Sequence, residues 1–151
     1  MAALANPQKL GAALLIALTV SACGTKNLLV AGDGMSPTLT SGQNVIVNTS
    51  AYDSASPKRA DIVLFKMNGE QIARIVGLPG ETISFPDGVA AVNDLRLNET
   101  YLAPGTLTAA PQNTYPVPAG SYFVLHDNRA KLADSRTFGS IARSAIEGKI
   151  G

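Results

Sequence analysis

Short apolar runs separated by turn-forming residues constrain the fold of this chain more than any other feature of its sequence. From residue 28 onward, runs of four to six residues rich in Val, Ile, Leu and Phe alternate with dipeptides such as Asn68-Gly69, Pro79-Gly80 and Asn93-Asp94. Runs of this length are typical of strands, and such dipeptides favour the turns that join them. No helical periodicity extends beyond a few residues. The sequence therefore predicts a mostly β domain built from antiparallel strands.

Seven strands are expected on this basis, and one long connection stands apart from them. That connection, residues 103–116, contains three prolines and predicts an exposed excursion or flap. The expected strands are 28–31, 45–48, 62–66, 71–76, 82–85, 89–92 and 121–125.

Length and composition favour a single compact domain plus a targeting segment. The chain has 151 residues, of which 46% are hydrophobic and 15% charged. Twelve Lys and Arg against eleven Asp and Glu leave a formal charge of +1, and no basic run could follow a phosphate backbone, so we expect no nucleic-acid partner. One cysteine and one histidine form neither a disulfide framework nor a Cys/His zinc spacing, so we expect no metal and no cofactor.

The N-terminal residues have the pattern of a bacterial targeting signal. Lys9 precedes an apolar run, 10–20, and Ser21-Ala22 supply the small residues found before a cleavage site. This run of 11 residues is well short of the roughly 20 that are needed to span a bilayer. Cys23 follows directly, and Val20-Ser21-Ala22-Cys23-Gly24 resembles the lipobox of a bacterial lipoprotein precursor.

This pattern predicts a signal peptide over 1–22, a tether with a first strand over 23–30, and a β domain over 31–151. We expect Cys23 to be lipidated after cleavage, which anchors the domain to a membrane on the extracytoplasmic, periplasmic side of the bacterial cell envelope. Two alternatives stay open. One is an ordinary secretory signal with an incidental cysteine, and the other is an uncleaved N-terminal anchor, which the shortness of the apolar run disfavours.

A tight turn rich in small residues, followed by a β-branched strand, is the most informative motif in the chain. It reads Ala31-Gly32-Asp33-Gly34-Met35-Ser36-Pro37-Thr38-Leu39 and leads into Val45-Ile46-Val47. The segment resembles the nucleophile segment of bacterial type I signal peptidases, in which the pattern is Ser-Met-x-Pro-Thr-Leu before a Val-rich strand.

Three further blocks carry the same resemblance, which covers residues from about 29 to 139. Two of these blocks, Leu-Pro-Gly and Asp-Asn-Arg, are absent from the related repressor-type self-cleaving proteins, whereas conjugation-type relatives stay open as an alternative family. The blocks are Lys58-Arg59-Ala60-Asp61-Ile62-Val63-Leu64-Phe65, then Ile72-Ala73-Arg74-Ile75-Val76-Gly77-Leu78-Pro79-Gly80-Glu81, and finally Val117-Pro118-Ala119-Gly120-Ser121-Tyr122-Phe123-Val124-Leu125-His126-Asp127-Asn128-Arg129, continued by Asp134-Ser135-Arg136-Thr137-Phe138-Gly139.

The resemblance implies a catalytic centre in which four positions are substituted in this chain. The family's nucleophilic Ser corresponds to Gly34, and its general-base Lys corresponds to Ala73. The Ser that orients this Lys corresponds to Leu132, and a neighbouring Gly corresponds to His126. Glycine has no atom that can attack a carbonyl, and alanine cannot accept a proton. The resemblance therefore implies a degenerate member that has lost its Ser-Lys dyad.

The resemblance also implies substrate-binding and structural residues. Gly32 lies where a backbone N–H or a small residue can line an oxyanion site, and the strand edges near Met35 and Ile72 can hold an extended peptide. The expected substrate-binding residues are Gly32, Met35, Pro37, Ile72 and Ile75. Asp127, Asn128, Arg129, Asp134 and Arg136 are expected to be structural, with the charged residues forming ion pairs that hold loops behind the cleft.

Ser36 and His126 suggest an alternative catalytic pair, a relocated Ser-His dyad. Ser36 occupies the variable position of the motif, and a His that replaces a Gly more often fills space than acts in catalysis. The sequence offers no other base to replace the missing Lys.

Two classes of function follow from these observations. The first is a catalytically inactive, membrane-anchored, signal-peptidase-like protein that binds extended or leader peptides or assists the assembly of secreted proteins. The alternative is an active type I signal peptidase, a serine endopeptidase that cleaves signal peptides with an atypical residue set. In both, the expected partners are signal-peptide or secreted-protein segments and, through Cys23, the membrane.

Overall fold

Residues 24–151 are described by a computed structural model, so the predicted signal peptide and Cys23 lie outside the described residues. The strands are β1 (Thr25–Leu29), β2 (Asn44–Asn48), β3 (Ile62–Lys66), β4 (Glu70–Gly77), β5 (Thr82–Ser84), β6 (Ala91–Val92), β7 (Leu95–Arg96), β8 (Thr114–Pro116), β9 (Ser121–Leu125), β10 (Ile141–Ala142) and β11 (Ile146–Ile150). The helical turns are η1 (Pro86–Gly88), α1 (Ser135–Phe138) and η2 (Arg143–Ala145). Residues 24–151 contain no helix that is long and apolar enough to cross a membrane.

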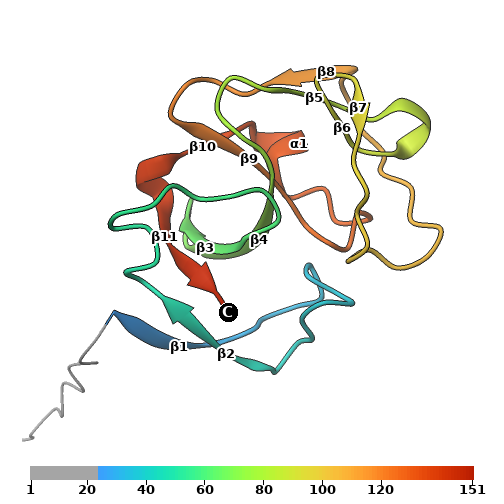
Figure 1. Ribbon diagram of the computed structural model, residues 1–151. Coiled ribbons are helices and arrows are strands. Elements are labelled where there is room, and N and C mark those ends of the chain that lie inside the picture. The colour runs from blue at the N-terminus through green and yellow to red at the C-terminus, as the bar shows by residue number, and fades with distance from the viewer. Residues whose placement is uncertain (1–23) are drawn as a thin grey trace, which may run out of the picture.

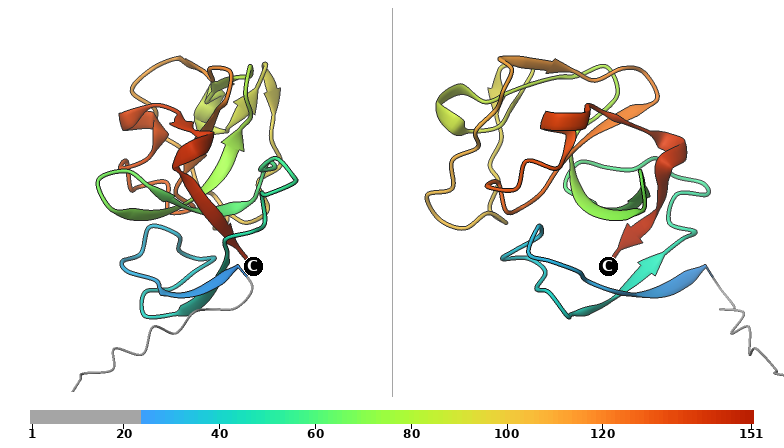
Figure 2. Two further views of the ribbon diagram at one scale, coloured as in Figure 1. Left: turned by 90° about the vertical axis from the view of Figure 1, so that its left-hand side faces the viewer. Right: turned by 180° about the vertical axis from the view of Figure 1, so that it is seen from behind.

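The strands form two antiparallel sheets (Figures 1 and 2). The larger sheet has the order β1-β2-β11-β3-β4-β9-β10, and the smaller has the order β7-β6-β5-β8. β1 and β2 lie at one end of the molecule and the smaller sheet at the other, with β3, β4 and β9 between them. This arrangement confirms the predicted mostly β, antiparallel fold, and the described residues form one compact domain.

Burial on both faces explains why the central strands are apolar at consecutive positions. Val63 and Phe65 of β3 pack into a core cluster on one face, and Leu64 packs into a different cluster on the other. Successive side chains of a strand point to opposite faces, so a strand covered on both sides needs an apolar residue at every position. β2 instead buries Val45 and Val47 and exposes the residues between and beside them, since one of its faces meets solvent.

Residues with positive φ occupy positions where the chain reverses. Asn68 and Gly69, with φ of 53° and 116°, join β3 to β4, as the Asn-Gly pair predicts. Ala60 also has a positive φ, 73°, just before β3. The signal peptidase block that residues 58–65 resemble reads Arg-Gly-Asp-Ile-Val, with Gly at this position, and the left-handed backbone explains that Gly, because a Cβ is unfavourable there.

The expected strands agree with the structure best where the apolar run is continuous. Residues 62–66 and 121–125 coincide with β3 and β9, and the other expected strands overlap observed ones with shifted ends. β1 begins earlier than expected because its pairing with β2 extends back to Thr25, which lies opposite Asn48. The prediction of an exposed excursion over 103–116 is wrong in part, since Thr108 and Tyr115 are buried and Thr114–Pro116 forms β8.

Candidate functional site

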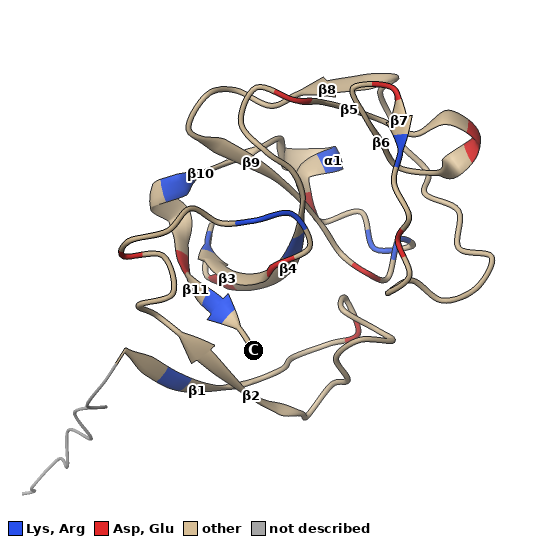
Figure 3. Cartoon of the chain, viewed as in Figure 1, with Lys and Arg blue, Asp and Glu red and all other residues tan. Residues whose placement is uncertain are grey.

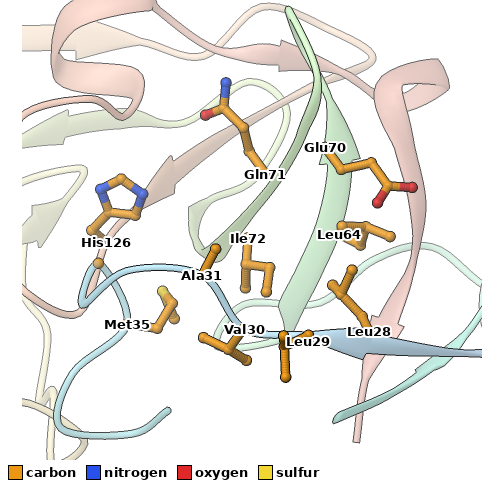
Figure 4. Close-up of a pocket in the computed structure, with 11 residues that line it drawn as sticks. Leu28, Leu29, Val30, Ala31, Met35, Leu64, Glu70, Gln71, Ile72 and His126 are labelled. Carbon is orange, nitrogen blue, oxygen red and sulfur yellow. The ribbon is translucent and has the colours of Figure 1, made fainter. Parts of the chain in front are cut away.

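A cavity of about 220 Å³ lies between the end of β1, the turn that follows it, and the start of β4 (Figure 4). Its walls are mostly apolar, with Glu70 near one end and His126 at the other. Pockets for drug-sized ligands usually measure about 300 to 1,000 Å³, so this cavity suits small side chains. The lining residues are Leu28, Leu29, Val30, Ala31, Gly34, Met35, Leu64, Glu70, Gln71, Ile72 and His126.

The turn that carries Gly34 is held at its base and at its tip. At the base, the N–H of Val30 donates to the carbonyl of Gln43 at 2.8 Å. At the tip, the N–H of Asn128 donates to the carbonyl of Gly34 at 2.9 Å, and its side-chain amide reaches the carbonyl of Asp33 at 3.3 Å. The turn is therefore fixed against the segment that follows β9, and Gly34 stays at the cavity wall.

The imidazole of His126 occupies the space beside Gly34 where a side chain would begin. A Cβ built on Gly34 would lie 3.2 Å from His126 Cδ2 and 3.3 Å from Nε2. Both contacts are tighter than ordinary van der Waals distances, so a larger residue at 34 requires the ring to move. Nδ1 of the ring is buried and has no hydrogen-bond partner among residues 24–151.

A buried ion pair lies behind the turn. Arg74 donates to both carboxylate oxygens of Asp127, from Nε at 2.8 Å and from Nη2 at 2.6 Å, and the Thr38 hydroxyl also donates to Asp127. The Arg74 guanidinium stacks on the ring of Tyr101 at 3.8 Å. This group joins β4, the turn and the segment after β9 with charge-assisted hydrogen bonds, which restrict its geometry.

Two further buried pairs hold the loops around this group. Arg129 pairs with Glu99 and donates to the Thr108 hydroxyl at 2.8 Å. Arg136 donates to both oxygens of Asp134, at 3.0 and 2.8 Å. In Figure 3 basic and acidic positions are interspersed over the fold, and three of the arginines, Arg74, Arg129 and Arg136, are buried.

One exposed pair lies beside the cavity. The Lys131 ammonium, 3.1 Å from Asp33 Oδ1, holds the pKa of Asp33 below its ordinary value, and His126 contributes a smaller effect. Lys131 is half exposed and its ammonium is engaged by the Asp33 carboxylate, so it is not placed as a buried base for residue 34. In the described part of the chain, no group of His, Cys, Asp and Glu is arranged to hold a metal ion.

Comparison with known proteins identifies the family. The family model described as "Signal peptidase, peptidase S26" matches residues 6–151. Signal peptidase I of Bacillus caldolyticus is 37% identical over 138 residues, which cover 82% of this chain and 76% of that protein. Signal peptidase IB of Staphylococcus aureus is 31% identical over 139 residues, covering 80% and 73% of the two chains. This chain belongs to the signal peptidase family.

A solved signal peptidase structure agrees with this assignment. The crystal structure of a signal peptidase I from Enterococcus faecalis V583 superposes with a TM-score of 0.55 at 30% sequence identity. The match covers 64% of this chain and 97% of that one.

The two positions that correspond to the nucleophile and the base of the signal peptidase pattern have different surroundings in this chain. Gly34 lines the cavity, whereas Ala73 is 1% exposed and packs in the core cluster with Phe65 and Val124. Leu132 is 45% exposed, and its carbonyl accepts hydrogen bonds from the Asp134 N–H and the Thr137 hydroxyl. None of the three side chains can supply a nucleophile, a base or an orienting hydroxyl.

The residues that the sequence assigns to binding separate into different places. Met35 and Ile72 line the cavity. Ile75 is 0% exposed and lies in the core, because it points to the same face of β4 as Ala73. Gly32 is exposed and does not line the cavity, and Pro37 lines a separate hollow. An assignment by family block could not separate these residues, because it ignores the side to which each one points.

Ser36 and His126 also line different hollows. Ser36 lies with Pro37 beside the 103–109 loop, whereas His126 lies at the end of the cavity. Among the described residues, no hydrogen bond joins the two side chains. The geometry does not assemble the relocated dyad.

The expected structural residues have partners that the sequence did not single out. Asp134 and Arg136 pair with each other, but Asp127 pairs with Arg74 and Arg129 pairs with Glu99. Asn128 holds the turn through its N–H and its side-chain amide. Arg74 could have been suspected from the sequence, because an arginine inside an otherwise apolar strand needs a buried counter-charge.

Proposed function

We propose that this chain binds extended peptides from secreted proteins, signal peptides among them, in the cavity beside Gly34 and does not cleave them. The observation that carries the proposal is an apolar cavity whose nucleophile position is Gly34, covered by the ring of His126. Neither the cavity lining nor the adjoining turn supplies a lysine that is buried and free to act as a base.

Free strand edges at the cavity support peptide binding. β4 pairs with β3 along its whole first half, but it pairs with β9 only from Arg74 onward. The other edge of residues 70–73 therefore has no strand partner among residues 24–151. Within the described part of the chain, β1 is an edge strand that pairs only with β2. Unpaired backbone groups at such edges form hydrogen bonds with an added peptide strand.

The cavity itself supports small apolar side chains as the preferred ligand groups. Met35, Leu64 and Ile72 supply its apolar wall, and its volume of about 220 Å³ leaves no room for several large side chains. Burying small apolar groups against such a wall gains roughly 25 cal/mol for each Å² removed from water. Peptides of the Ala-x-Ala type are therefore the expected ligands.

Filling the cavity is expected to abolish peptide binding. In a Gly34→Trp variant the indole takes the space beside His126 and blocks the cavity, so the affinity for an Ala-x-Ala peptide should fall at least about 10-fold. A calorimetric titration of each protein with the peptide measures the change in affinity. Ala119→Trp is the matched control, because Ala119 is exposed in the turn before β9 and lines no part of this cavity. Equal affinity in wild type and Gly34→Trp, or no affinity in either, contradicts the proposal.

We further propose that a lipid on Cys23 anchors the domain to a membrane on the extracytoplasmic side. Only eleven residue steps separate Cys23 from Gly34, which span less than about 40 Å even when fully extended. Such a tether keeps the cavity close to the bilayer surface, from which signal peptides emerge. A diacylated or triacylated cysteine would hold the domain there stably.

Replacing Cys23 with Ser is expected to release the protein from membranes or to leave its precursor uncut. The hydroxyl of Ser is not the thiol that accepts the lipid, so the acyl chains and their contribution to membrane binding are lost. Membrane fractionation and intact mass measure both effects in cells. Lys26→Ala, which leaves the lipobox unchanged, should partition like wild type. Identical mass and partitioning of the Cys23→Ser protein would disprove lipidation.

A further inference from the structure

We infer that His126 takes the place of the missing nucleophile in ligand recognition, and that its Nε2–H donates a hydrogen bond to a backbone carbonyl of the bound peptide. The inference rests on the proposed peptide-binding function and names the ligand group that this end of the cavity selects. His126 thus acts as a residue that positions and selects the ligand.

The position of the ring carries the inference. Nε2 lies 3.3 Å from the point where a Cβ of residue 34 would be, so it occupies the neighbourhood of the absent serine hydroxyl. Figure 4 shows the ring at the end of the cavity, beside the turn that carries Ala31 and Met35. A peptide that runs along the apolar wall formed by Met35 and Ile72 would bring its backbone past this nitrogen.

The surroundings of the ring determine which nitrogen carries the proton. Nδ1 is buried and has no partner among residues 24–151. Buried N–H groups without an acceptor are rarer in proteins than under-satisfied acceptors, so the tautomer that fits this site has its proton on Nε2. Nε2 forms no hydrogen bond with the described residues and is a free donor.

The backbone that carries the ring is held in place from behind. The backbone N–H of His126 donates to Asp134 Oδ2 at 3.0 Å, and its carbonyl accepts from Arg129 Nε at 2.9 Å. The acidic side chain of the turn, Asp33, is engaged by Lys131 at 3.1 Å. A side chain on a backbone fixed in this way has only its own torsions left to restrict when a ligand binds, which favours affinity.

A carbonyl acceptor next to a small side chain is the ligand feature that this arrangement selects. The cavity has room for the small side chain. The Nε2–H group donates a hydrogen bond, so it pairs only with a ligand group that is a hydrogen-bond acceptor. A site built to donate a hydrogen bond rejects a ligand that lacks the acceptor, because the donor is then left unpaired. The family pattern has Ser at position 34 and Gly at position 126, and neither residue carries an imidazole N–H.

Peptide analogues that lack one carbonyl test the inference directly. The parent is an Ala-x-Ala peptide extended by several residues, and the analogue replaces the amide after the second Ala with an (E)-alkene, which removes its carbonyl. An ester at the same bond is the matched control, because it removes the N–H and keeps the carbonyl. Wild-type protein should bind the parent and the ester about 3- to 10-fold more tightly than the alkene.

Substitution of His126 completes the test. His126→Ala should lose about 3- to 10-fold in affinity for the parent peptide and nothing for the alkene. His126→Gln, which retains an N–H donor on a side chain of similar length, should recover part of the loss. An equal loss on parent and alkene, or no loss on either, overturns the inference while peptide binding stands. No binding of any peptide by the wild-type protein overturns the proposed function and the inference with it.

Discussion

Replacing Arg74 with Ala is expected to lower the free energy of unfolding by about 3 to 5 kcal/mol. The substitution leaves the Asp127 carboxylate, whose side chain is 0% exposed, with the Thr38 hydroxyl as its remaining side-chain donor. A buried charge without its counter-ion bears its full desolvation cost. Domains of this size are usually stable by about 5 to 15 kcal/mol, so the variant loses a large share of its stability. Urea unfolding followed by circular dichroism measures the change.

An exposed pair provides the matched control for this experiment. Arg96 and Asp87 form a pair whose side chains are 52% and 83% exposed, and Arg96→Ala should change the stability by no more than about 1 kcal/mol. The double variant Arg74→Met with Asp127→Leu removes both buried charges, and it should recover much of the loss. If Arg74→Ala proves no more destabilising than Arg96→Ala, the buried pair does not hold the site as described.

Restoring the serine alone is expected to leave the chain without measurable peptidase activity. Gly34→Ser supplies a hydroxyl, but Ala73 offers no base, and the ring of His126 crowds the new side chain. In a serine protease, loss of the nucleophile or the base alone costs about as much as loss of the whole set, on the order of 10⁶ in kcat. One restored member therefore regains little. Incubation with a preprotein, followed by mass spectrometry for a new N-terminus, tests the wild type and this variant together.

The combined variant Gly34→Ser, Ala73→Lys, His126→Gly and Leu132→Ser is expected to gain activity. His126→Gly clears the space at residue 34, and in the family pattern the lysine at position 73 is the base for the serine at position 34, although Ala73 packs in the core cluster of this chain. Burial at position 73 should lower the pKa of the introduced lysine toward the range of a general base. A positioned base contributes about 10² to 10⁴-fold, so the gain over Gly34→Ser should reach at least about 10²-fold. The signal peptidase I of Bacillus caldolyticus serves as the positive control for the assay.

Cleavage by the wild-type protein would contradict the proposed inactivity. If that cleavage disappeared in Ser36→Ala or His126→Ala, it would establish the relocated dyad, although the two residues line different hollows. Turnover by Gly34→Ser alone would reveal a base that the geometry around the turn does not provide.

The strands that the sequence predicted best are those that are buried on both faces. β3 and β9 are covered on both faces, so their apolar runs are continuous and their ends are visible in the sequence. β11 was missed because Ile146-Glu147-Gly148-Lys149-Ile150 contains two charges and a glycine. Its alternation is real, since Ile146, Gly148 and Ile150 are buried and the charged residues between them are half-buried. The glycine permits a close approach to β2, where a Cβ would lie 2.6 Å from the carbonyl oxygen of Asn48.

The sequence by itself determined the family and which residues stand where the family pattern has its Ser and Lys, because the presence of an atom at a position is a property of the residue alone. Gly34 and Ala73 carry neither a nucleophile nor a base in any fold. Only the tertiary structure decided which side chains meet. It brings His126 against Gly34, pairs Arg74 with Asp127, and turns Ile75 into the core while Ile72 faces the cavity. These contacts join segments that are far apart in the chain. Strand twist, strand register and loop closure together determine them, so no local sequence pattern encodes them.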